Sequence, residues 1–220
     1  TKSFEYDVAG VKHTFGIGGV HGAKEKYHGK GLLIHVDVTS YYPSLMIRYG
    51  LLTRNCAYPE KFKDIYDTRV KLKAEGKKKE QAPYKIVLNG TYGISKDKMS
   101  LAYDQRQANN VCVNGQLLLI DLIDKLESIQ GFKLIQSNTD GLIVKIPDTD
   151  IAFNQLDDIC FEWETRTGMG LGFDFIDEIW QRDVNNYIFR DIDGKLERKG
   201  GYVKELNDLD NNLPIVNKAI

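Results

Sequence analysis

The hairpin on which the predicted fold depends is Phe132-Lys-Leu-Ile-Gln-Ser-Asn-Thr-Asp-Gly-Leu-Ile-Val-Lys-Ile146. Two short apolar runs flank a polar turn in this segment, which is typical of a β-hairpin, and Asp140 lies at its tip. A second run of strand length, Gly31-Leu-Leu-Ile-His-Val-Asp-Val38, carries another acid, Asp37, near its end. If the two segments are neighbouring strands, the two acids lie close together.

A close pair of carboxylates suggests a cation site. Two ionised carboxylates a few ångströms apart repel each other unless a cation neutralises them. Magnesium is commonly held by one or two carboxylates together with water and phosphate oxygens. The pair Asp37 and Asp140 therefore predicts two-metal phosphoryl transfer on a nucleoside triphosphate. An acid at a hairpin tip is also a common turn former, which is the alternative interpretation of Asp140.

Helical periodicity appears in several of the remaining segments. Residues 59–75 begin with a proline suited to a first helical turn and stop before Gly76. A second helix is expected from Glu80 to Asn89, with Pro83 near its start, where a proline is tolerated. These two helices would form a hairpin. Two more helices are expected at 105–129 and 151–167, and further strands at 173–179, 187–190 and 196–203.

The first 30 residues contain the glycine-rich stretch Gly16-Ile-Gly-Gly-Val-His-Gly22. A nucleotide-binding loop would follow a strand, open a helix and end in Lys-Ser or Lys-Thr, and this stretch lacks that setting. No clear hydrophobic period appears around it. We therefore expect a turn-rich initial segment.

Composition excludes a membrane role and points to one basic region. The net charge is -1, and no apolar run approaches the roughly 20 residues needed to span a bilayer. The first residues do not form a signal segment, so a cytoplasmic location is expected. The three cysteines, an odd number without metal-ligand spacing, are expected to be reduced and buried. Residues 61–98 contain eleven Lys or Arg against five Asp or Glu, so this region is the one expected to meet phosphate.

Three motifs resemble the signatures of family B DNA polymerases, in the family's order. Asp37-Val-Thr-Ser-Tyr-Tyr-Pro-Ser44 resembles Asp-x-x-Ser-Leu-Tyr-Pro-Ser and differs at Tyr41. Lys85-Ile-Val-Leu-Asn-Gly-Thr-Tyr-Gly93 resembles Lys-x-x-x-Asn-Ser-x-Tyr-Gly and differs at Gly90. Asn138-Thr-Asp-Gly141 resembles Asp-Thr-Asp-Ser. The resemblance covers roughly residues 31–203.

The resemblance implies a role for each matching residue. Asp37, Asp140 and the Val38 carbonyl would bind two Mg²⁺ ions, with Mn²⁺ as a substitute. Tyr42 would pack under the sugar of the incoming dNTP and exclude a 2'-hydroxyl. The other implied nucleotide-binding residues are Ser40, Tyr41, Arg69, Lys73, Lys85 and Asn89, and those implied for primer-template DNA are Tyr92, Gly93, Tyr187 and Lys199. As an alternative, the basic residues of the helical hairpin could simply form its solvent-exposed side. Tyr187 could likewise be an ordinary strand tyrosine, and Lys199 a surface lysine.

Several departures from the family pattern affect these expectations. Asn138 is neutral where the family commonly has an acid, so we expect altered metal affinity. Gly90 lacks the serine hydroxyl and loosens a helix by up to about 1 kcal/mol. Asn185 replaces the lysine of a Lys-x-Tyr element near Tyr187.

The resemblance implies a mixed α/β (α+β) fold, with a ferredoxin-like or RRM-like polymerase palm and an inserted helical-hairpin fingers subdomain. The expected boundaries are 1–55 and 96–205 for the palm, 56–95 for the fingers, and 206–220 for the start of a truncated thumb or tail. The implied function is a DNA-directed DNA polymerase core of bacteriophage or prophage type, acting in the bacterial cytoplasm without its exonuclease and thumb domains. The alternative is a catalytically silent nucleic-acid-binding module, and a weaker one is a reverse transcriptase.

Overall fold

The computed structural model describes residues 3–203, which form nine strands and five helices. The strands are β1 (Phe4–Val8), β2 (Val11–Gly16), β3 (Gly19–Ala23), β4 (Tyr27–Val38), β5 (Lys133–Asn138), β6 (Gly141–Lys145), β7 (Leu171–Asp183), β8 (Asn186–Asp191) and β9 (Leu196–Lys199). The helices are α1 (Tyr41–Arg48), α2 (Pro59–Ala74), α3 (Lys78–Lys96), α4 (Gln105–Leu126) and α5 (Asp150–Thr167). The predicted mixed α/β class is confirmed.

All nine strands belong to one antiparallel sheet in the order β1-β2-β3-β5-β6-β4-β7-β8-β9. Its centre is built from β4, α4, β5, β6, α5 and β7 in chain order, with the strands arranged β5-β6-β4-β7. This is the β-α-β-β-α-β arrangement of ferredoxin-like folds. The predicted hairpin at 132–146 is β5 and β6, and it lies directly beside β4.

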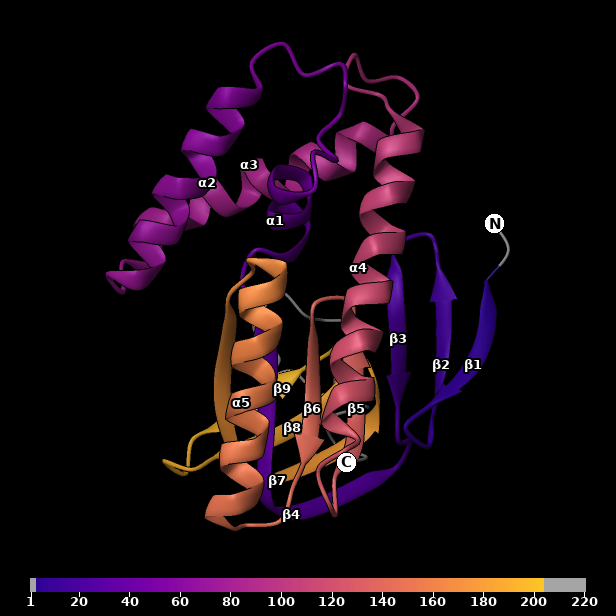
Figure 1. The fold of residues 1–220 in the computed structure, drawn as a ribbon, viewed down its shortest axis with the longest axis vertical. Helices are drawn as coiled ribbons and strands as arrows, with labels where there is room; N and C mark the ends of the chain where they lie inside the picture. Colours follow the sequence, from indigo (N-terminus) through magenta and orange to yellow (C-terminus); the bar gives the residue numbers. More distant parts are fainter. Residues whose placement is uncertain (1–2, 204–220) are drawn as a thin grey trace.

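The helices α4 and α5 lie over one face of the sheet (Figure 1), and within residues 3–203 no helix covers the other face. Ile34 and Val36 of β4 pack in the larger core with residues of α4 and α5. Leu33 belongs instead to a smaller apolar cluster formed by strands alone. Because successive side chains of a strand point to opposite faces, Asp37 shares the face of Leu33.

The helices α2 and α3 pack against each other as the predicted hairpin. The first begins and ends as expected, but α3 is longer than predicted and contains Pro83 in its interior. A proline there removes one backbone hydrogen bond and crowds the carbonyl four residues earlier. The helix continues because Leu88, which is fully buried, anchors it in the core where α3 meets α1 and α4.

The expectation that the first 30 residues lack a period is wrong. They form the three-stranded meander β1–β3 and the start of β4, and in β2 the buried Val11, His13 and Phe15 alternate with exposed residues. The histidine hides this pattern, because a polar side chain stands where the strand period calls for an apolar one. His13 is fully buried because Nδ1 pairs with the Val11 carbonyl at 2.7 Å and Nε2 with Ser137 Oγ at 2.6 Å.

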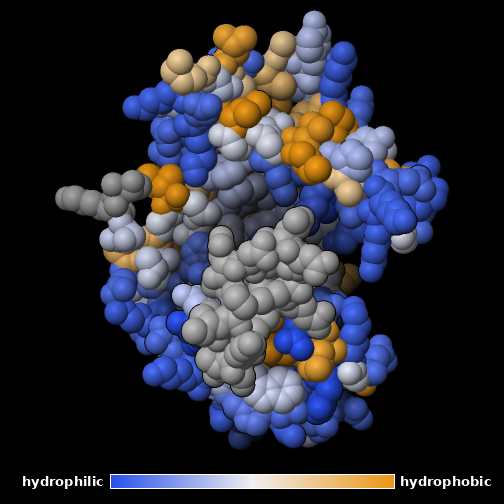
Figure 2. Space-filling model, turned by 180° about the vertical axis from the view of Figure 1, so that it is seen from behind, coloured by the Kyte–Doolittle hydropathy of each residue, from blue (hydrophilic) through white to orange (hydrophobic). Residues whose placement is uncertain are grey.

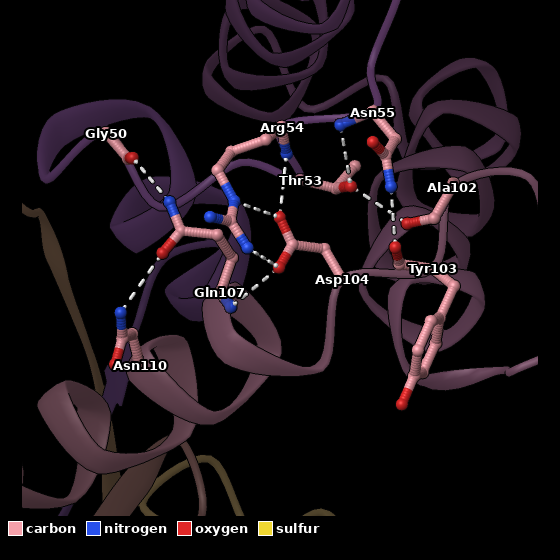
Figure 3. A network of polar contacts seen from close by, with 9 residues as sticks. All are labelled: Gly50, Thr53, Arg54, Asn55, Ala102, Tyr103, Asp104, Gln107 and Asn110. Atoms are coloured by element: carbon pink, nitrogen blue, oxygen red, sulfur yellow. Dashed lines mark hydrogen bonds and ion pairs between the residues drawn. The ribbon is translucent and has the colours of Figure 1, made fainter.

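A polar network joins the two chain segments that connect the α2–α3 hairpin to the rest of the molecule (Figure 3). Arg54 donates from Nε and Nη2 to the Asp104 carboxylate, both at 2.8 Å. Thr53 Oγ1 donates to the Ala102 carbonyl at 2.8 Å. The hydrogen bond from Arg54 lowers the pKa of Asp104. We call this network the junction.

Cys56, Cys112 and Cys160 are free thiols; Cys112 and Cys160 are buried as predicted, but Cys56, in the segment before α2, is only half-buried. Within residues 3–203, no helix is both long and apolar enough to cross a membrane. The segment predicted to begin a thumb or tail, 206–220, lies outside the described residues.

Candidate active site

A cleft of about 370 Å³ lies where the end of β4, the hairpin turn and the helices α1 to α3 meet. Seen from the side opposite α4 and α5, the molecule is hollowed between its helical part and its sheet, and hydrophilic residues border the hollow (Figure 2). The residues that line the cleft are Asp37, Val38, Ser40, Tyr41, Tyr42, Arg69, Lys73, Gln81, Lys85, Asn89, Tyr92, Thr139 and Asp140.

Strand register brings the two predicted acids together. Asp37 is paired with Gly141 across β4 and β6, and the Val38 amide donates to the Asp140 carbonyl at 2.8 Å. Burial raises the pKa of Asp37, and the negative charge of Asp140 raises it further. The ionised pair is therefore electrostatically unfavourable by itself, and a bound cation would relieve it.

Gly141 allows the two strands to approach this closely. A Cβ at this position would lie 2.9 Å from the Val36 carbonyl oxygen. Only glycine fits without displacing backbone, so this residue helps to set the separation of Asp37 and Asp140. At the end of β5, Asn138 Oδ1 accepts a hydrogen bond from the Thr139 amide at 2.8 Å. The neutral side chain of Asn138 therefore has a hydrogen-bond partner within the turn.

The opposite wall of the cleft is basic and comes from the helical hairpin. Arg69 of α2 is buried and donates a hydrogen bond to Ser40 Oγ, while its Nε has no partner within residues 3–203. Burial lowers the pKa of Arg69. Lys73 Nζ donates to Thr39 Oγ1 at 3.3 Å, and its charge lowers the pKa of Asp37 against the larger effect of burial. With Lys85 of α3, these cations face the acids across one cleft.

Aromatic residues form a third wall. The Tyr42 hydroxyl donates to the Gly18 carbonyl at 2.9 Å, and its ring packs edge-on against Tyr92 at 4.5 Å between centroids. Burial raises the pKa of the Tyr42 phenol, which stays neutral. Tyr41 is buried, and its hydroxyl donates to the Gly115 carbonyl at 2.5 Å, so its polar atom is used within the core.

No family model and no curated protein matches this chain. Among solved structures, the family B DNA polymerase from the hyperthermophilic archaeon Pyrobaculum calidifontis matches with a TM-score of 0.62 and 17% identity. The match covers 90% of this chain and 30% of that one. The chain has the fold of part of a family B DNA polymerase.

Three predicted contacts of this polymerase fold do not line the cleft. Gly93 lies on the exposed side of α3, with open space beside it. Tyr187 and Lys199 are paired across β8 and β9. Tyr187 is largely buried, and burial raises its pKa, with a smaller contribution from the charge of Asp140. Lys199 is exposed, and its Nζ lies 3.6 Å from Glu197 Oε2.

The cleft also includes two residues, Gln81 and Thr139, for which no role was predicted. Gln81 lies one helical turn before Lys85 on α3, and its buried Oε1 has no hydrogen-bond partner within the described chain. The four-residue spacing from Lys85 was the available signal. Thr139 matches the threonine of the hairpin motif, to which no role was assigned, and its Oγ1 is 3.0 Å from His21 Nε2.

Proposed function

We propose that this chain is the palm and fingers of a DNA-directed DNA polymerase that adds dNMP from a dNTP to a primer 3'-hydroxyl. One observation carries the proposal. A single cleft joins a carboxylate at the end of β4 and one in the β5–β6 turn to Arg69, Lys73 and Lys85 of a helical hairpin. In this proposal the sheet with α4 and α5 is the palm, and α2 with α3 is the fingers.

The donor set suits magnesium. Asp37, Asp140 and the Val38 carbonyl offer hard oxygen ligands, and the remaining ligands of such a site are ordinarily water and phosphate oxygens. The raised pKa of Asp37 reflects the uncompensated charge that a divalent cation would neutralise. When bound, Mg²⁺ supplies activation of the attacking hydroxyl and neutralisation of the phosphate charge. Mn²⁺ is expected to substitute.

The chain's own residues would bind and orient the nucleotide. Arg69, Lys73 and Lys85 would donate charged hydrogen bonds to the triphosphate, which are stronger than neutral ones. The ring of Tyr42, fixed at its hydroxyl, would leave no room for a ribose 2'-oxygen. Asn89 would lie beside the nascent base pair, with Tyr92 packed against Tyr42.

Primer-template DNA would meet the outer strands of the sheet and the exposed side of α3. Tyr187 and Lys199 would donate to the primer backbone, a contact that positions DNA without reading its sequence. Tyr92 and Gly93 would lie near the template base. We further propose that the chain is of bacteriophage or prophage type and acts in a bacterial cytoplasm; the compact helical hairpin and the motifs support this proposal.

The test is extension of a labelled primer-template with dNTP and Mg²⁺ at low salt, beside Asp140→Ala. A matched control is Asp148→Ala, which removes an exposed carboxylate from the loop after β6. We expect extension by the wild type and by Asp148→Ala and loss of extension in Asp140→Ala. Magnesium-dependent dNTP binding without extension, lost in Asp140→Ala, would indicate a nucleotide site that does not turn over.

A catalytically silent nucleic-acid-binding module is the second candidate, and Asn138 favours it because an acid commonly stands at this position. It predicts primer-template binding with neither extension nor metal-dependent dNTP binding. That result would reject the polymerase proposal.

A further inference from the structure

The glycine-rich segment Gly16–Gly22 lies beside the cleft, and the proposed function gives it no role. It runs from the end of β2 into β3, next to α4 (Figure 1). Gly18 and Gly19 have backbone φ values of 150° and 151°, which residues other than glycine rarely adopt. The glycines are therefore required by the path of the backbone.

Side chains of α4 hold this segment in place. Gln116 Nε2 donates to the Gly16 carbonyl at 2.7 Å and to the Gly19 carbonyl at 2.9 Å. The Gly18 amide donates to Cys112 Sγ at 3.2 Å. Backbone groups that a loop normally leaves to water are thus satisfied by one helix, which fixes their positions.

The fixed segment in turn holds Tyr42. The Gly18 carbonyl accepts the hydrogen bond from the Tyr42 hydroxyl at 2.9 Å. This bond is at the far end of the ring, while the near end is set by α1, so the ring is restrained at both ends. Exclusion of a 2'-hydroxyl by a ring depends on sub-ångström placement, because the group to be rejected is one oxygen atom.

The same segment supports the turn that carries the second acid. A Cβ at Gly19 would lie 2.2 Å from Thr139 Oγ1, so the glycine is in close contact with the residue before Asp140. His21 Nε2 lies 3.0 Å from the same Thr139 oxygen. One short segment therefore touches both the aromatic and the acidic wall of the cleft.

We propose that Gly16–Gly22 is a positioning segment that fixes Tyr42 and thereby sets the selection of deoxyribonucleotides over ribonucleotides. The inference rests on the proposed polymerase function. Gln116 attaches the segment to α4 together with Cys112, and it acts on the nucleotide only through the segment and Tyr42.

Two substitutions test this chain of contacts. Gln116→Met removes both amide donors with little change in size, and Tyr42→Phe removes the hydroxyl but keeps the ring. The measurement is single-nucleotide primer extension with dATP and with ATP, reported as the ratio of the two kcat/KM values. We expect each variant to lower this ratio about tenfold, the effect of losing roughly one hydrogen bond's free energy.

The double variant sharpens the test. Both substitutions break one path, so the double variant should lower the ratio little more than either alone. Asn114→Ala is the matched control, since this amide lies on the same helix and donates to the Asn110 carbonyl instead. It should leave the ratio unchanged.

The outcomes separate this inference from the function on which it rests. If the wild type prefers dATP and the Gln116→Met and Tyr42→Phe variants keep the same ratio while extending with dATP, the segment is only a structural turn and the inference is overturned. If the wild type shows neither extension nor magnesium-dependent dNTP binding, the polymerase proposal fails and takes this inference with it.

Discussion

The acidic and basic walls of the cleft are built by different means. Asp37 lies on the central strand β4, and Asp140 lies in the turn between β5 and β6, where register and the close contact at Gly141 fix their separation. Lys73 and Lys85 lie on two helices that project from the sheet. The positions of the acids are therefore set by backbone hydrogen bonds, whereas those of the bases depend on long side chains.

The helical hairpin has few anchors of its own. Phe62 and Arg69 are the buried residues of α2, and Leu88 and Ser95 those of α3. Partly buried residues such as Ile65 and Tyr66 also pack against the core, and the junction ties together the two segments that connect the hairpin to the sheet. The acidic wall is therefore held within the sheet, whereas the basic wall is held by fewer buried residues.

The largest effect is expected from Asp37→Asn, which removes a charge from the acidic wall. Loss of one catalytic electrostatic group typically costs on the order of a hundred- to a thousandfold in rate, so primer extension should fall by at least this factor. Primer-extension kinetics beside Asp148→Ala measure the loss. Retention of wild-type extension would remove Asp37 from the site.

The same substitution has a second, opposite consequence for stability. Asp37 has a raised pKa, so the folded, metal-free protein binds more protons than the unfolded chain, and stability falls as pH rises from the ordinary carboxyl range through the raised pKa. Asparagine does not ionise. Asp37→Asn should therefore melt at a higher temperature than the wild type at neutral pH and equally at acid pH, and thermal unfolding across pH without metal measures this.

The next largest effect is expected at Lys85 on the basic wall. Lys85→Met keeps most of the side chain's length but removes one charged hydrogen bond to the triphosphate, which should raise KM for dNTP about 10- to 100-fold. Lys79→Met, at an exposed position of the same helix, is the control. Equal KM values for the two variants would contradict a triphosphate role for Lys85.

A smaller effect is expected from the junction that links the walls. Asp104 accepts a hydrogen bond from the Gln107 amide at 3.3 Å as the N-cap of α4, besides pairing with Arg54. Asp104→Ala should lower the free energy of unfolding by about 1 kcal/mol from the cap alone. Its KM for dNTP should rise severalfold, less than in Lys85→Met. Denaturant unfolding and dNTP titration check both values, and an unchanged KM would show that the junction does not position the cations.

The smallest effect is expected outside the cleft, at Lys199. This exposed cation would contact one primer phosphate, so Lys199→Ala should weaken primer-template binding uniformly across sequences and reduce the salt dependence of affinity by about one ion. Binding titrations at several salt concentrations measure the slope. Lys195→Ala, at an exposed lysine paired with Glu197, is the control.

Much of this arrangement is predictable from local sequence. The hairpin at 132–146 was visible because apolar runs flank a polar turn, and α2 because a proline and a glycine bracket a helical stripe. The convergence of Asp37 and Lys85 on one cleft was implied by the matched motifs, and that of Arg69 by the wider resemblance to the family, not by the spacing of charges.

Other parts were hidden for physical reasons. The strand β2 was missed because the buried His13 breaks the apolar alternation, and its burial depends on Ser137, more than a hundred residues away. The short helix α1 (Tyr41–Arg48) was not predicted, since its sequence was interpreted only as a motif. The hydrogen bond from the Tyr42 hydroxyl to the Gly18 carbonyl joins residues that are distant in the sequence. Every residue has a backbone carbonyl, so the residue type does not predict this acceptor.

Gly141 makes the acidic wall sensitive to mutation at a residue that has no chemical role. It carries no reactive atom and touches no substrate in the proposed mechanism, yet any side chain there would meet the Val36 carbonyl and push apart the strands that hold the acids. In a random screen for loss of function, replacements at this glycine should be as damaging as replacements of the carboxylates themselves.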